Sequence, residues 1–131
     1  MKKDIEIPVA KDVYVAIVRE WNEEFLDKDW NAYIINSQTN PIELTMVVSK
    51  GYEGDRKTPV MRHAIGDVAA KSYKKIEVVQ DDVLALNNEF YVTYYSDNKL
   101  YEKRFLFEQN SVKESNLNTI PILDKDGIYA K

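Results

Sequence analysis

The chain has 131 residues, of which 44 % are hydrophobic and 31 % are charged, and it contains no cysteine. This composition is typical of one folded domain rather than of a disordered or membrane-spanning chain, and the lack of cysteine excludes disulfides, thiolate metal sites and thiol nucleophiles. A formal charge of −4 argues against broad non-specific binding of nucleic acids. The basic pair near the start is followed by no apolar segment of signal-peptide type, so we expect a cytoplasmic protein without a membrane partner.

The first apolar run, residues 13–18, is mostly β-branched and therefore predicts a strand. A turn at residues 27–28 would join it to a second strand and create two facing pairs, Phe25 with Trp30 and Trp21 with Ile34. The alternative is an amphipathic helix over residues 17–28, because Ile17, Trp21 and Phe25 are spaced four residues apart. We favour the two strands over the helix.

The middle of the chain alternates between loops and strands. Residues 36–41 are rich in Asn and Ser and end in proline, which predicts a loop. Residues 51–59 form a second, charged loop that holds two of the four glycines. Between these loops, the strand expected over residues 42–49 carries four apolar side chains on one side: Ile42, Leu44, Met46 and Val48.

Residues 60–68 fit both a strand and a helix. Alternation supports the strand, whereas Val60, Ala64 and Val68 keep helical spacing; Gly66 and the flanking β-rich sequence favour the strand. Residues 74–79 follow after a short turn and predict another strand. Its alternation turns two residues inward, Ile76 and Val78, and two outward, Lys75 and Glu77.

Residues 89–108 predict one β-hairpin, closed by a turn at residues 96–99. The register pairs Tyr95 with Leu100 and Tyr94 with Tyr101. One face of the hairpin is suited to a core and carries Phe90, Val92, Tyr94, Tyr101, Lys103, Phe105 and Phe107. The other face is half aromatic and half charged and carries Tyr91, Thr93, Tyr95, Leu100, Glu102, Arg104 and Leu106.

About seven strands separated by turn signals predict an all-β fold, an antiparallel two-sheet β-sandwich of immunoglobulin-like type. We expect residues 1–110 to form this single domain and residues 111–131 to be a C-terminal extension packed on the sheet edge. Residues 120–123 contain a proline, which suits an edge contact. The pattern leaves open whether this segment covers the tyrosine-rich face of the hairpin.

No motif predicts a catalytic, cofactor or metal site. The single histidine, His63, and Asp67 would lie about 13 Å apart along a strand, too far for a hydrogen bond. Ser49 and Ser72 have no recognisable base partner. Residues 124–127 lack the flanking carboxylates of a calcium loop, and residues 51–58 lack the spacing of a phosphate-binding loop. We therefore expect neither enzymatic activity nor a cofactor.

Two surfaces are candidates for binding. On the hairpin face, aromatic and apolar side chains beside an arginine are typical of interface cores: Tyr91, Tyr95, Leu100, Arg104 and Leu106. The charged loop is the second candidate, through Tyr52, Asp55, Arg56 and Lys57. A different class of partner, single-stranded RNA, would use the basic residues Lys71, Lys74, Lys75 and Arg104 interleaved with tyrosines.

Several stretches of the chain are distinctive, among them VREWNEEFLDKDWNAYIIN, VSKGYEGDRKT, MRHAIGD, LALNNEFYVTYY and KLYEKRFLF. With these stretches the chain, up to about residue 110, resembles a family of short uncharacterised proteins from Bacteroidetes-type bacteria. Some members carry the label phenylalanyl-tRNA synthetase alpha subunit. The four scattered glycines of this chain cannot build the glycine-rich ATP site of such a synthetase, so the label implies at most a translation-associated partner.

Together these patterns predict a non-enzymatic β-sandwich module for protein–protein interaction or self-association as a homo-oligomer. The alternative is an RNA- or tRNA-associated protein that uses a local basic and aromatic sheet surface. Nucleic acid is the less favoured partner, because glutamates lie among the basic residues and the whole chain is acidic.

Overall fold

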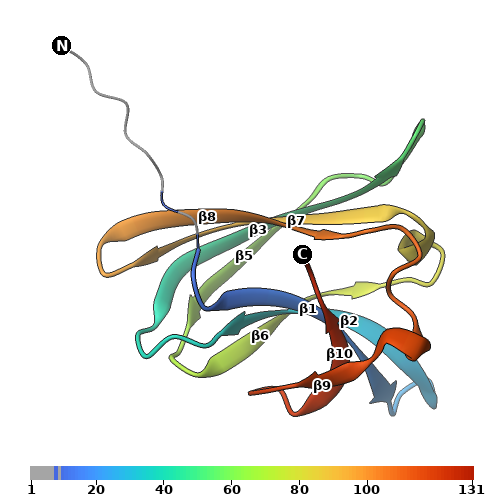
Figure 1. Cartoon of the computed structure of the whole chain (residues 1–131), viewed down its shortest axis with the longest axis horizontal. Helices are drawn as coiled ribbons and strands as arrows, with labels where there is room; N and C mark the ends of the chain where they lie inside the picture. Colours follow the sequence, from blue (N-terminus) through green and yellow to red (C-terminus); the bar gives the residue numbers. More distant parts are fainter. Residues whose placement is uncertain (1–7, 9) are drawn as a thin grey trace.

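The computed structural model describes residue 8 and residues 10–131, and two antiparallel sheets form this part of the chain (Figure 1). The first sheet has the order β6 (Ser72–Val79), β2 (Asp27–Asn36), β1 (Val13–Asn22), β10 (Lys125–Tyr129) and β9 (Asn118–Ile120). The second has the order β4 (Arg56–Lys57), β3 (Ile42–Glu53), β7 (Asn87–Ser96) and β8 (Lys99–Phe107), and β5 (Met61–Val68) also pairs with β3. Helix in the described part is confined to two 3₁₀ turns, Val83–Ala85 and Glu114–Asn116, so none there could cross a membrane.

Figure 1 shows the two sheets as stacked layers, which confirms the predicted all-β sandwich. The described residues form ten strands rather than about seven, because the chain after residue 110 adds β9 and β10 and the charged loop contains β4. The immunoglobulin-like type stays a prediction.

The core lies between the sheets, and the predicted hairpin of β7 and β8 supplies most of its aromatic residues. The predicted register is confirmed, because Tyr94 pairs with Tyr101 and Tyr95 pairs with Leu100. The Phe90 and Phe107 rings meet edge to face with centroids 5.7 Å apart, and both side chains are buried. Burying such rings removes much apolar area from water, which is the main stabilising contribution in folding.

The strands β1 and β2 form as predicted, but the predicted register is wrong. Trp30 pairs with Arg19 and Ile34 with Val15, and the turn falls at residues 23–26 instead of 27–28. The observed register aligns the two apolar runs, whereas the predicted one would place Val15 and Ile17 opposite the polar loop at residues 38–40. Trp21 is therefore 55 % exposed, and Phe25 lies in the turn.

Two bulges overturn predictions based on strict alternation. In β3 a bulge after Ile42 puts Leu44 at φ 51°, so Ile42 is buried while Leu44 and Met46 are exposed. In β6 the pairing with β2 shifts between Ala32 and Tyr33. One consequence is that Val78, predicted to point inward, is 49 % exposed. A bulge adds one residue to a strand and thereby changes the face that the following side chains occupy.

The end of the chain covers the outer face of the first sheet. β10 pairs with β1 and β9 pairs with β10, so residues 111–131 contribute the edge of this sheet. Ile120 and Leu123 pack with a group of buried residues on the outer side of β1 and β2: Ala16, Val18, Tyr33 and Ile35. The segment at residues 120–123 therefore does not cover the tyrosine-rich face of the β7–β8 hairpin.

Candidate functional site

The five predicted interface residues of the hairpin share the outer face of the second sheet. Strand pairing sets Tyr91 opposite Arg104 and Tyr95 opposite Leu100, with Leu106 in the neighbouring row. Tyr95 is 42 % exposed and Arg104 is also exposed, while the other three are half-buried. This is the side of the sheet that faces away from the core.

The neighbouring strand β3 widens this surface, which sequence reasoning missed. Met46 pairs with Thr93 and is exposed, and Leu44 is exposed in the β3 bulge. The sequence did place Leu44 and Met46 on one face, but the alternation assigned that face to the core. We call the resulting apolar surface the outer patch, made of Leu44, Met46, Tyr91, Tyr95, Leu100 and Leu106.

Two glutamates, Glu89 and Glu102, pair with side chains in and around the outer patch. The Glu89 carboxylate forms ion pairs with two basic side chains, Arg104 Nε at 3.4 Å and Lys50 Nζ at 3.7 Å. The Tyr91 hydroxyl donates to the Glu102 carboxylate, and this hydrogen bond, with a smaller effect of burial, raises the pKa of Tyr91. This hydrogen bond links the two strands of the hairpin at the edge of the outer patch.

A groove with a volume of about 450 Å³ opens between the β3–β4 hairpin and this face. Its principal wall residues, which define the basic groove, are Lys50, Tyr52, Lys57, Val60, Glu89 and Arg104. Of the predicted loop residues, Tyr52 and Lys57 pair across the hairpin and line the groove, whereas Arg56 forms an ion pair with Glu53 and Asp55 lies at the turn. The two surfaces predicted separately from the sequence thus meet at the basic groove.

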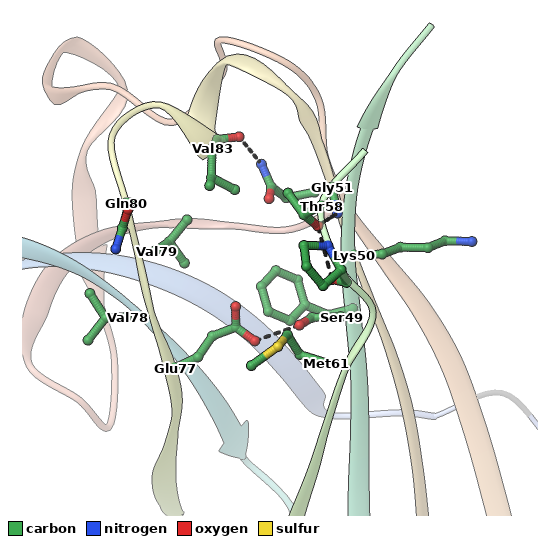
Figure 2. Close-up of a pocket in the computed structure, with 13 residues that line it drawn as sticks. Ser49, Lys50, Gly51, Thr58, Met61, Glu77, Val78, Val79, Gln80 and Val83 are labelled. Atoms are coloured by element: carbon green, nitrogen blue, oxygen red, sulfur yellow. Dashed lines mark hydrogen bonds between the residues drawn. The ribbon is translucent and has the colours of Figure 1, made fainter. Parts of the chain in front are cut away.

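A second cavity, about 260 Å³ in volume, opens between the sheets beside β5 and β6 (Figure 2). Glu77 points into it, and its Oε1 accepts hydrogen bonds from Ser49 Oγ at 2.6 Å and from His63 Nε2 at 2.8 Å. Figure 2 also shows the Lys50 side chain on the far side of β3, directed away from the cavity. The sequence placed Glu77 outside, because alternation could not reveal the bulge in β6.

The geometry at Glu77 links strands rather than assembling a nucleophile. Ser49 and His63 both contact the Glu77 carboxylate and not each other, so the three side chains do not form the serine–histidine–carboxylate arrangement of a hydrolase. Asp67 accepts instead from the backbone N–H of Leu44 at 3.2 Å. The described residues also contain no group of three or more His, Cys, Asp or Glu arranged to hold a metal ion. The three side chains join β3 and β5 of the second sheet to β6 of the first.

The basic residues considered for RNA binding do not form one surface. Lys71, Lys74 and Lys75 lie on or just before β6 of the first sheet, while Arg104 lies on β8 of the second. Lys71 Nζ donates to the Ser37 carbonyl at 2.5 Å. Such a division does not provide the continuous basic and aromatic platform that single-stranded nucleic acids use.

Comparison of the chain with protein-family models, with curated proteins and with solved structures finds no match. The resemblance to the Bacteroidetes-type proteins therefore stays a prediction. The outer patch and the basic groove bring together both candidate surfaces from the sequence.

Proposed function

We propose that this chain is a cytoplasmic, non-enzymatic protein-interaction module that self-associates through the outer patch and the basic groove. One observation carries the proposal: the two outer faces of the sandwich differ. Ile120 and Leu123 cover part of the outer face of the first sheet and bury a group of residues there, whereas Tyr73, Val78 and Tyr129 of that face remain exposed. The outer patch of the second sheet keeps exposed Leu44, Met46 and Tyr95, and no described segment packs over it.

The composition of this surface supports the same proposal. Contiguous exposed apolar groups bordered by charges are typical of interaction sites, and tyrosine and arginine are enriched where interfaces bind most strongly. The edge of β8 is less available for binding a partner than the outer face of the second sheet. Glu102 exchanges backbone hydrogen bonds with Pro8 and Ala10, and Leu106 exchanges them with Lys131. A partner would therefore bind on the face of the sheet.

The double variant Tyr95→Ala with Leu106→Glu tests this proposal. Removing one ring and placing a charge in the outer patch should convert the expected oligomer to a monomer, measured by light scattering after gel filtration. Val78→Glu is the matched control, because it adds the same charge to an exposed position of the first sheet. Tyr95→Ala with Arg104→Glu is the alternative if Leu106→Glu lowers the yield of folded protein. A wild-type monomer at all concentrations, or an unchanged mass of both double variants, would contradict the proposal.

A further inference from the structure

The turn between β1 and β2 exposes large apolar side chains to an unusual degree. Leu26 is 74 % and Phe25 is 71 % exposed, the two highest values among the large apolar residues of the described chain. Neither belongs to a core cluster. Single exposed apolar residues are ordinary, but adjacent ones at a projecting turn are typical of a contact with another molecule.

The backbone of this turn gives a second indication. Leu26 has φ 51°, in the left-handed region where glycine and asparagine are favoured and a bulky side chain is strained. Asn22 already organises the turn, since its Oδ1 accepts from the backbone N–H of Glu24 at 2.9 Å. A leucine is therefore unfavourable for the isolated turn, and no core cluster of the chain buries its side chain.

The turn and the basic groove have opposite charges. Glu23, Glu24 and Asp27 surround the two apolar side chains of the turn and are exposed. The lining of the basic groove has three basic side chains, Lys50, Lys57 and Arg104, and one carboxylate, Glu89, which pairs with Lys50 and Arg104, so the net charge of the lining is positive. Tyr52 and Val60 add apolar wall to the groove. An acidic segment with an apolar tip matches this groove in both respects.

The positions of the two features suit a reciprocal contact. Figure 1 shows the β1–β2 turn and the β3–β4 turn at the same end of the molecule, projecting from opposite sheets. No residue of the turn lines the groove of its own chain. In a two-fold symmetric dimer, a contact from the first copy to the second is repeated from the second to the first.

We propose that the β1–β2 turn, with Phe25 and Leu26 at its tip, occupies the basic groove of a second copy of this chain in a two-fold symmetric dimer. This inference rests on the proposed function and names the segment that the groove receives. Each contact is small compared with a standard interface of about 1,200–2,000 Å². The dimer should therefore dissociate on dilution, and salt should weaken it by screening the charges.

Charge exchange between two variants tests the inference. Glu23→Lys with Glu24→Lys makes the turn basic, and Lys50→Glu with Lys57→Glu makes the groove acidic. Each variant alone should be monomeric, because turn and groove then repel, and an equimolar mixture should regain a dimer of one copy of each. Because Lys50 is paired with Glu89, Lys57→Glu alone serves as a second groove variant. Asp81→Lys and Lys113→Glu are controls that change the net charge in the same directions at exposed positions outside both features.

Leu26→Asn separates association from folding. Asparagine suits φ 51°, so the unfolding temperature of the monomer should stay equal or rise, while dimerisation should weaken about tenfold or more.

An unchanged dimer in Leu26→Asn, or a charge-exchanged mixture that stays monomeric, would overturn the inference. If the charge variants alone remain dimeric while Tyr95→Ala with Leu106→Glu is monomeric, the inference fails and the proposed function stands. If the wild-type chain is monomeric at every concentration, both fail.

Discussion

Two buried tyrosines show how differently the same side chain is accommodated in this sandwich. The Tyr33 hydroxyl donates to the Glu20 carboxylate at 2.9 Å, so its polar end is paired. The Tyr94 side chain is fully buried against Tyr101, and its hydroxyl makes no hydrogen bond of ordinary geometry to any described residue. An unpaired buried hydroxyl is destabilising, whereas a paired one contributes to stability.

Replacing each tyrosine with phenylalanine should therefore change stability in opposite directions. Tyr94→Phe keeps the ring and removes an unpaired hydroxyl, so the free energy of unfolding should stay equal or rise by up to about 1 kcal/mol. Tyr33→Phe should lower it by about 1 kcal/mol, because Glu20 loses its donor. Urea denaturation of the two variants provides the measurement. A larger loss for Tyr94→Phe than for Tyr33→Phe would mean that the Tyr94 hydroxyl is paired in solution.

At the level of elements, whether a segment forms a strand is decided locally. The pairing register of the strand and the face that each side chain occupies are not decided locally. The β7–β8 hairpin was predicted correctly because its turn is short and its two faces differ strongly in hydrophobicity. The β1–β2 register was wrong because the turn lies at residues 23–26, earlier in the chain than the Asp27-Lys28 pair suggested. Alternation assigned Met46 and Glu77 to the wrong faces because it could not reveal the bulges in β3 and β6. Met46 belongs to the outer patch, and Glu77 lines the cavity between the sheets.

The C-terminal strand β10 depends on a close approach that only glycine permits. A Cβ at Gly127 would lie 2.7 Å from Val18 Cγ1 and 2.8 Å from the Ile17 carbonyl oxygen. Gly127→Ala should therefore lower the free energy of unfolding by about 1–3 kcal/mol and reduce amide exchange protection in β10. Asp126→Ala, one position earlier on an exposed side chain, is the control and should have little effect. Equal stability of the two variants would mean that β10 can move away from β1 without cost.

At the level of the whole molecule, the ionisation of two buried tyrosines is coupled to folding: Tyr94 lies in the core between the sheets, and Tyr33 lies under the C-terminal segment on the outer side of the first sheet. Burial raises the pKa of Tyr94 to about 12. Burial, followed by the hydrogen bond to Glu20, also raises the pKa of Tyr33. The neutral forms are therefore favoured in the folded chain. Their contribution to stability is complete below the unfolded pKa of about 10 and is lost as the pH rises through the folded values.

We therefore expect the free energy of unfolding to fall progressively between about pH 10 and pH 12. Urea denaturation at a series of pH values measures this dependence. In Tyr94→Phe the free energy of unfolding should fall less over this pH range than in the wild-type protein. The difference separates the effect of Tyr94 from the titration of surface lysines in the same range. If the wild-type protein and Tyr94→Phe decline in parallel, Tyr94 does not contribute to the pH dependence.

The sequence by itself determined the all-β class, most of the strands, the core face of the β7–β8 hairpin and the five residues that share its outer face. These follow from local alternation and β-branched composition, which act over a few residues. Only the tertiary structure decided which outer face is covered, because that depends on where β9 and β10 pack. It also decided that Lys57 and Arg104 line one groove, since strands far apart in the chain become neighbours only when the sheet assembles.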